Sequence, residues 1–219
     1  MRKFLLILCI VAMVGLSGCA SKSTYDYSQP TVDTKKQNSR VFNKPLAMVW
    51  DAAIKSIGED FFVLDNIEKD SKIITLSYSV DNPANYIDCG TVTVTTSGGA
   101  SGNGAFTHGY ADRFVSYNHG EGLYPHPSSI ARKAALDGKA NIIFTEEGPN
   151  QTRVTINARY ILGVNFEVVR FDGMTSTRVS NITFNTGQEG IGATGEARCR
   201  TKFVLEQGIL DGIGVRLPR

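Results

Sequence analysis

All three histidines of the chain fall in one window, at His108, His119 and His126. Asp112 and Glu121 lie among them. Imidazole and carboxylate groups bind zinc or copper when they converge on one point. The spacings of 11 and 7 residues match no local metal motif, and no helical period places the groups on one face. These five residues form a candidate metal site, and a solvated loop is the alternative.

Two other patterns that carry chemistry in known proteins are incomplete here. Gly190, Gly192 and Gly195 have the GxGxxG spacing of dinucleotide-binding turns, but no strand follows to complete a βαβ unit. The chain has no Gly-x-Ser-x-Gly motif, which argues against an α/β-hydrolase. We therefore predict no catalytic residues and no bound cofactor, and we expect that the protein is not an enzyme.

The N-terminus has the parts of an export signal. Arg2 and Lys3 precede thirteen uncharged apolar residues, 4–16. This run is shorter than the roughly 20 residues that span a bilayer, but it fits the apolar core of a signal peptide. The next residues, Leu16-Ser17-Gly18-Cys19, resemble the lipobox of bacterial lipoproteins. The resemblance implies that residues 1–18 are removed and that Cys19 carries a covalent lipid; an ordinary signal peptide with a chance cysteine is the alternative.

The same resemblance implies an address and a partner. Residue 20 is Ala rather than Asp, which in such families is typical of an outer-membrane destination. We expect the chain on the periplasmic face, with the cell surface as the alternative, bound to membrane lipid through its anchor.

Without residues 1–18 the chain has 21 basic and 21 acidic residues. A neutral body argues against nucleic-acid binding.

Cysteine usage predicts one disulfide bond. Cys9 lies in the signal and Cys19 in the lipobox, so Cys89 and Cys199 are left as a pair in an oxidising compartment. No pair of histidines lies near them in sequence, so a structural zinc site is not indicated there. Two buried free thiols are the alternative.

Hydrophobic patterning predicts one globular domain over 39–219, after a polar, flexible tether over 19–38. Helical spacing after Pro45 predicts a helix to Ile57 that includes Trp50 in the core, and a last helix is predicted over 201–213. Alternation and turn residues predict strands, which we place at 39–42, 61–66, 72–80, 90–97, 141–147, 152–162, 166–171 and 177–186. We expect a loop-like Gly/His-rich insert over 97–128 and a short helix over 129–137.

Together these elements predict an α+β fold, in which a mostly antiparallel sheet packs against an N-terminal and a C-terminal helix. Residues 40–80 support it, with Val49-Trp50 on a Pro-led helix, Phe62 on a strand, a turn near Asp70, and then Ile73, Leu76 and Tyr78. This outline is similar to the helix-grip modules of the BamC family of outer-membrane lipoproteins and of START-like domains. The cysteine pair, the long insert and the short last helix depart from that pattern.

The resemblance implies a non-enzymatic accessory or interaction protein of the cell envelope, with an envelope protein as its partner. A module that binds a small apolar ligand or lipid between sheet and helix is the first alternative. A metal-binding protein that uses the window from His108 to His126 is the second.

Overall fold

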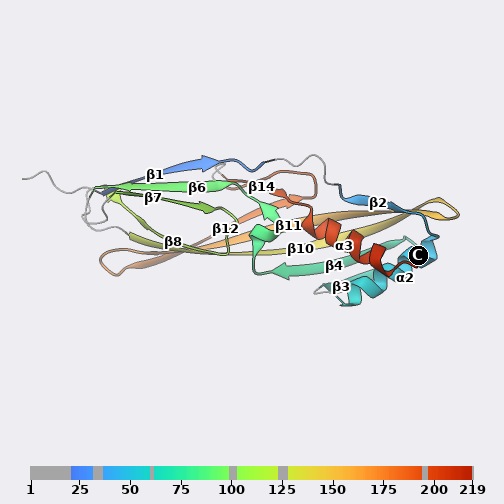
Figure 1. Ribbon diagram of the computed structural model, residues 1–219. Coiled ribbons are helices and arrows are strands. Elements are labelled where there is room, and N and C mark those ends of the chain that lie inside the picture. Colours follow the sequence, from blue (N-terminus) through green and yellow to red (C-terminus); the bar gives the residue numbers. More distant parts are fainter. Residues whose placement is uncertain are drawn as a thin grey trace, which may run out of the picture.

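The computed structural model describes residues 21–31, 37–59, 62–98, 103–122, 128–193 and 197–218, with no side-chain detail at 121–122. The molecule is elongated, and one long hairpin runs along it (Figure 1). Strands β10 (Ser128–Gly148) and β11 (Gln151–Val169) form this hairpin and pair from Ser129 with Val169 to Gly148 with Gln151. The predicted turn at Pro149-Asn150 is confirmed.

Shorter strands extend the hairpin on both sides into an antiparallel sheet. Beside β10 lie β8 and then β4, with β3 outside β4, and beside β11 lie β2 and β12. The bounds of these strands are β2 (Ser39–Phe42), β3 (Val63–Glu68), β4 (Ile73–Val80), β8 (Phe114–His119) and β12 (Thr175–Asn185).

One face of the hairpin is buried for most of its length. Even-numbered residues of β10 from 128 to 144, and of β11 from 152 to 164, point to this face, while the odd-numbered residues between them are more exposed. Such a period of two is the pattern of a strand with one covered face.

Two different covers lie on that face. Helices α2 (Leu46–Glu59) and α3 (Val204–Arg216) cover the turn end of the hairpin, and we call this region the helical half. The open end faces a second sheet in the order β7-β6-β1-β9, and we call this region the sandwich half (Figure 1). Its strands are β1 (Ser21–Ser28), β6 (Thr91–Ser97), β7 (Gly104–Gly109) and β9 (Glu121–Gly122).

The cysteine pair lies where the two halves meet. The turn η1 (Pro83–Asn85) leads into β5 (Ile87–Asp88), which pairs with β14 (Arg198–Thr201), and β13 (Gly190–Ile191) pairs with the other edge of β14. The sulfur atoms of Cys89 and Cys199 are 2.04 Å apart, a disulfide distance. They join the start of the second sheet to the segment that leads into α3.

The predicted α+β class is wrong, because the described residues form a β-rich fold with 59% strand and 17% helix. Both predicted long helices are present, at α2 and α3, and Trp50 is 7% exposed in the core. However, these helices cover only the helical half, and a second sheet takes their place on the rest of the buried face.

Three segments differ from the sequence-based expectation. Residues 129–137, expected as a short helix, belong to β10 and alternate between buried and exposed. Residues 21–28, expected in a flexible tether, form β1 against β6. The insert over 97–128 contains β7, β8 and β9. Each of these strands depends on a partner distant in sequence, which local patterning does not reveal.

None of the described helices is long and apolar enough to cross a bilayer.

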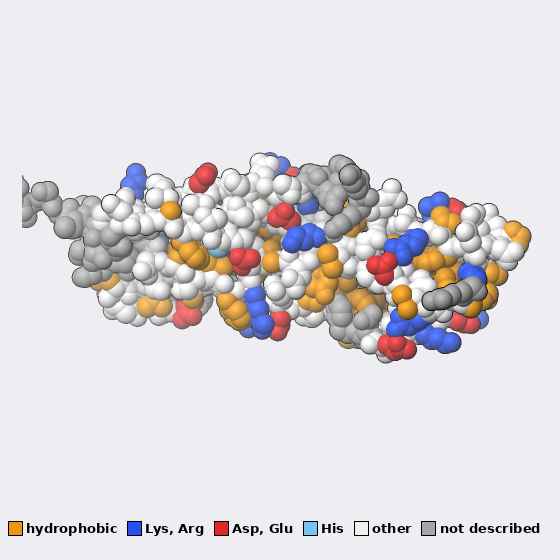
Figure 2. Space-filling model, viewed as in Figure 1, with side chains coloured by type: hydrophobic (Ala, Val, Ile, Leu, Met, Phe, Trp, Pro, Cys, Tyr) orange, Lys and Arg blue, Asp and Glu red, His pale blue; other side chains and the backbone are white. Residues whose placement is uncertain are grey.

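Charge is unevenly spread on the face shown in Figure 2, where most Lys and Arg side chains lie toward the helical half. On that face, the sandwich half presents fewer cationic side chains.

Candidate ligand pocket between the two sheets

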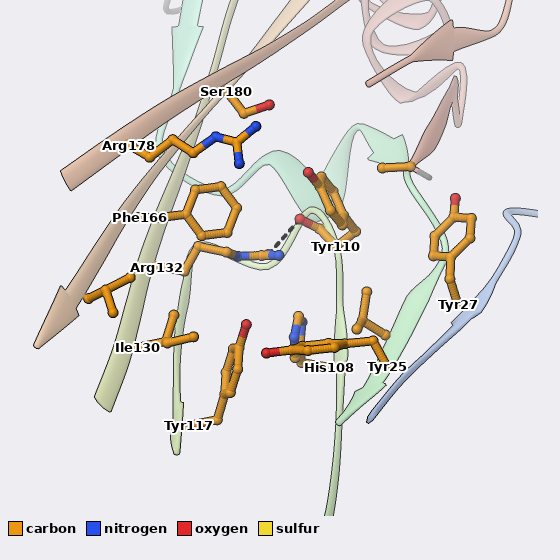
Figure 3. Close-up of a pocket in the computed structure, with 13 residues that line it drawn as sticks. Tyr25, Tyr27, His108, Tyr110, Tyr117, Ile130, Arg132, Phe166, Arg178 and Ser180 are labelled. Atoms are coloured by element: carbon orange, nitrogen blue, oxygen red, sulfur yellow. Dashed lines mark hydrogen bonds between the residues drawn. The ribbon is translucent and has the colours of Figure 1, made fainter. Parts of the chain in front are cut away.

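A pocket of about 540 Å³ lies in the sandwich half, between the hairpin sheet and the second sheet. Its walls come from β1, β6 and β7 on one side and from β8, β10, β11 and β12 on the other (Figure 3). Most of its surface is apolar or aromatic, and the lining residues are Tyr25, Tyr27, Val92, His108, Tyr110, Tyr117, Ile130, Arg132, Phe166, Val168, Arg178, Ser180 and Ala197. Its size falls in the range typical of small-molecule sites.

Arg132 is the most unusual side chain of this pocket. It occupies an inward position of β10 between Ile130 and Ala134, and it is only 3% exposed. Its Nη2 donates hydrogen bonds to the backbone oxygens of Tyr110, at 2.6 Å, and of Gly109, at 3.2 Å. Its Nε is buried and has no hydrogen-bond partner among the described residues.

Aromatic rings hold the guanidinium of Arg132 in place. The Tyr110 ring centre lies 4.9 Å from its central carbon, and the Phe166 ring centre lies at 6.0 Å. Cation–π contacts contribute about 0.5–2 kcal/mol each, depending on burial. No carboxylate among the described residues forms an ion pair with it; Asp112, whose charge reaches it, accepts a hydrogen bond from the Gly109 amide at 2.7 Å. Burying a charge costs several kcal/mol, and the ring contacts, the two carbonyl bonds and the charge of Asp112 counteract this cost.

His108 on β7 also faces the pocket and is 7% exposed. Its Nδ1 lies 3.0 Å from the backbone oxygen of Gly109, and since a carbonyl only accepts, Nδ1 carries the proton. Burial and the nearby charge of Arg132 lower the pKa of His108, while the Gly109 bond and Asp112 act in the opposite direction. The ring is therefore neutral at pH 7, and its buried Nε2 is an acceptor without a partner among the described residues.

Tyrosines form much of the remaining wall. The ring of Tyr117 stacks on that of His108 with centres 5.7 Å apart, and burial raises the pKa of Tyr117. The hydroxyl of Tyr27 donates to the backbone oxygen of Cys89 and accepts from the amide of Arg198, at 3.1 and 2.8 Å. The cysteine pair and its flanking backbone thus fix one wall of the pocket.

The β12 side of the pocket is more open to solvent. Arg178 is exposed, Ser180 is half-buried, and Arg178 pairs across the strands with Phe166. In Figure 3 the Phe166 ring lies between the side chains of Arg132 and Arg178. A ligand entering from this side would pass one arginine at the rim before it reaches the other inside.

The predicted metal ligands are not brought together in the described part of the chain. There, no three His, Cys, Asp or Glu side chains group closely enough to hold a metal ion. His108 faces the pocket, Asp112 binds the Gly109 amide, and Nδ1 of His119 is 2.7 Å from the hydroxyl of Tyr25. His126 and the side chain of Glu121 lie outside the described residues, so the complete site stays a prediction.

The remaining sequence-based sites have different outcomes. Cys19 lies outside the described residues, and its acylation stays a prediction. Gly190, the first glycine of the GxGxxG pattern, pairs with Cys199, and a Cβ there would lie 2.6 Å from the Phe184 ring. Close packing against β12 therefore accounts for this glycine.

Sequence reasoning missed the residues that make the pocket distinctive. The sequence predicts a short helix around Arg132 and a flexible tether at Tyr25 and Tyr27. One signal was present: residues 128, 130, 132, 134 and 136 alternate as a buried strand face, and Arg132 is in phase with Ile130 and Leu136. A charged residue at a buried strand position is uncommon and points to a specific role.

Comparison of the chain with protein-family profiles, with curated proteins and with solved structures finds no match.

Proposed function

We propose that this chain is a lipid-anchored protein of the cell envelope whose globular body binds a small, mainly apolar ligand between its two sheets. The observation that carries the proposal is the 540 Å³ pocket, with aromatic walls and with buried polar atoms that lack partners among the described residues. Ligand sites combine an apolar lining with a few convergent polar groups in this way. This pocket lies between two sheets, whereas the sequence analysis expects a ligand site between the sheet and a helix.

The position of β1 connects the pocket to the proposed anchor. Cys19 precedes Ser21, the first residue of β1, by two positions, which limits their Cα separation to about 7 Å. β1 supplies Tyr25 and Tyr27 to the pocket and begins at the end of the molecule opposite to the helices (Figure 1). An acylated Cys19 would hold the pocket close to the outer membrane, with the helical half pointing away.

A Cys19→Ala variant tests the anchor. We expect it to leave the membrane fraction and keep the native circular-dichroism spectrum, because the fold begins after the lipid site. Continued fractionation with membranes would contradict the proposed anchor.

A neutral fluorescent probe, N-phenyl-1-naphthylamine, tests the pocket. We expect saturable binding at one site by the Cys19→Ala chain, and loss of this binding after Ile130→Trp, which fills the pocket. Val179→Trp is the matched control, since Val179 is 63% exposed and does not line the pocket. Absence of saturable binding, or equal effects of both substitutions, would contradict the proposal.

A second candidate, the accessory or interaction role, is favoured by the edge strand β3. Its residues Val63, Leu64 and Ile67 are 64%, 42% and 42% exposed, and β4 is the one described strand that pairs with it. Exposed apolar edge strands are places where another chain can add a strand. Leu64→Lys should abolish crosslinking to an envelope protein if this surface is used, whereas Val179→Lys should leave it intact.

A further inference from the structure

The charges of the pocket are all of one sign. Arg132 lies inside it and Arg178 at its rim, and none of the described lining residues is acidic. The carboxylate of Asp112 accepts a hydrogen bond from the Gly109 amide, and its charge reaches Arg132 without forming an ion pair among the described residues. The interior therefore presents a cation to any molecule that enters.

The guanidinium of Arg132 is also held rigidly with donors to spare. Two carbonyl bonds use Nη2, and the rings of Tyr110 and Phe166 contact the guanidinium, as Figure 3 shows. A guanidinium has five N–H donors, and the Nε donor is buried without a partner among the described residues. A preorganised cation with unused donors is suited to bind a planar or tetrahedral anion through charge-assisted hydrogen bonds.

We infer that the ligand carries one anionic group, a carboxylate, sulfonate or phosphate ester, which binds Arg132 while its apolar body fills the space between the sheets. This inference rests on the proposed function, because it specifies the ligand of the same pocket. Arg178 attracts the anion at the rim, and the neutral His108 accepts a hydrogen bond from a hydroxyl or amide of the ligand through Nε2. A wholly neutral ligand would leave the buried charge of Arg132 unpaired.

Two probes that differ in one group test the inference. 1-Anilinonaphthalene-8-sulfonate has the same ring system as N-phenyl-1-naphthylamine, with an added sulfonate. Both are titrated against the Cys19→Ala chain without the signal residues 1–18, and against the same chain with Arg132→Gln, Arg178→Gln or Arg153→Gln. Arg153 is the control, because it pairs with Glu147 at 2.6 Å and does not line the pocket.

We expect the unsubstituted pocket to bind the sulfonate probe at least about tenfold more tightly than the neutral probe. Arg132→Gln should weaken the sulfonate probe by about 30-fold and change the neutral probe by less than about threefold. Arg178→Gln should weaken the sulfonate probe several-fold, and Arg153→Gln should have no effect. Because Arg178 is exposed, its substitution tests the charge even if Arg132→Gln fails to fold.

The outcomes separate this inference from the proposed function. If the neutral probe binds but neither pocket arginine affects the sulfonate probe, the pocket stands and the anionic ligand is excluded. If neither probe binds, both proposals fall. Displacement of the sulfonate probe by dodecanoate supports a lipid-derived acid, and displacement by 1-naphthoate supports a planar aromatic acid. Displacement by neither would contradict the inference.

Discussion

The helical half and the sandwich half use the same face of the same two strands for different purposes. Under the helices, Ile142, Ile156 and Tyr160 point inward, and all are fully buried. Under the second sheet the corresponding positions include Arg132, Phe166 and Val168, which border open space. The alternation of the hairpin thus decides which residues face inward, whereas the covering element decides whether they form a core or a pocket.

The comparison indicates that the two halves of the molecule have different roles. Two helices pack closely on a sheet because their side chains fill the space beneath them, as Trp50 does against Phe144 with ring centres 5.0 Å apart. In the sandwich half, the side chains do not fill the space between the two sheets, which leaves room for a ligand. We expect stability to depend mainly on the helical half and binding on the sandwich half.

The largest expected effect comes from removing the disulfide bond between Cys89 and Cys199, which lies where the two halves meet. Cys89 and Cys199 are 110 residues apart in sequence and both almost fully buried. Replacing both with alanine should lower the free energy of unfolding by about 2–5 kcal/mol, because the unfolded chain is no longer constrained. Urea unfolding measures this loss, and a reducing agent should reproduce it in the original chain.

Hydrogen exchange of the same double variant sharpens the comparison. Amides of β1 and β6 should gain more exchange than those of α2, because the bond fixes the start of the second sheet. Equal increases in amide exchange in both halves would contradict this difference between their roles.

The same substitution at two points of β10 compares the halves directly. Ile142 in the helical half is 0% exposed, and Ile130 at the pocket is 8% exposed. We expect Ile142→Ala to cost about 2–4 kcal/mol and Ile130→Ala about 1–2 kcal/mol, because Ile130 already borders open space. Denaturant midpoints measure both, and equal costs would show that the pocket is packed as tightly as the core.

A glycine of the helical half tests how tightly that half is packed. A Cβ at Gly138 would lie 2.0 Å from the backbone oxygen of Arg159 and 2.4 Å from the hydroxyl of Tyr78. That hydroxyl donates a hydrogen bond to the same oxygen at 2.9 Å, and it can do so because residue 138 is a glycine without a side chain. Gly138→Ala should cost about 1–3 kcal/mol. Gly163→Ala, on the outer face of the hairpin, should be nearly neutral in thermal unfolding.

The smallest effect is a pH dependence from the sandwich half. Because the pKa of His108 is lowered in the folded protein, the unfolded chain binds a proton more readily. Stability is complete above the ordinary histidine pKa of about 6.5 and decreases as the pH falls below it. His108→Gln should flatten the profile of unfolding midpoints between pH 7.5 and 5. A profile that is unchanged by this substitution would assign the dependence to other groups.

Parts of the fold followed from local patterns. The helix after Pro45, the last helix and the Pro149-Asn150 turn were predicted because helical period and turn chemistry act within a few residues. The strand alternation at 72–80 and 152–162 was also visible in the sequence. The candidate site was not, because Tyr25, Arg132 and Phe166 are far apart in sequence and meet only through strand pairing.

By itself, the sequence determined the cysteine pairing, by elimination within a predicted export context, and the inward phase of the strands at 72–80 and 152–162. Only the tertiary structure decided that 129–137 is strand and not helix, because Ala, Arg, Lys and Leu favour helix in isolation but here pair with β8, β4 and β11. Likewise, the polar residues 21–28 form a strand because β6, some 70 residues away, offers a partner edge. Strand pairing joins distant segments, so the pocket is a property of the assembled sheets.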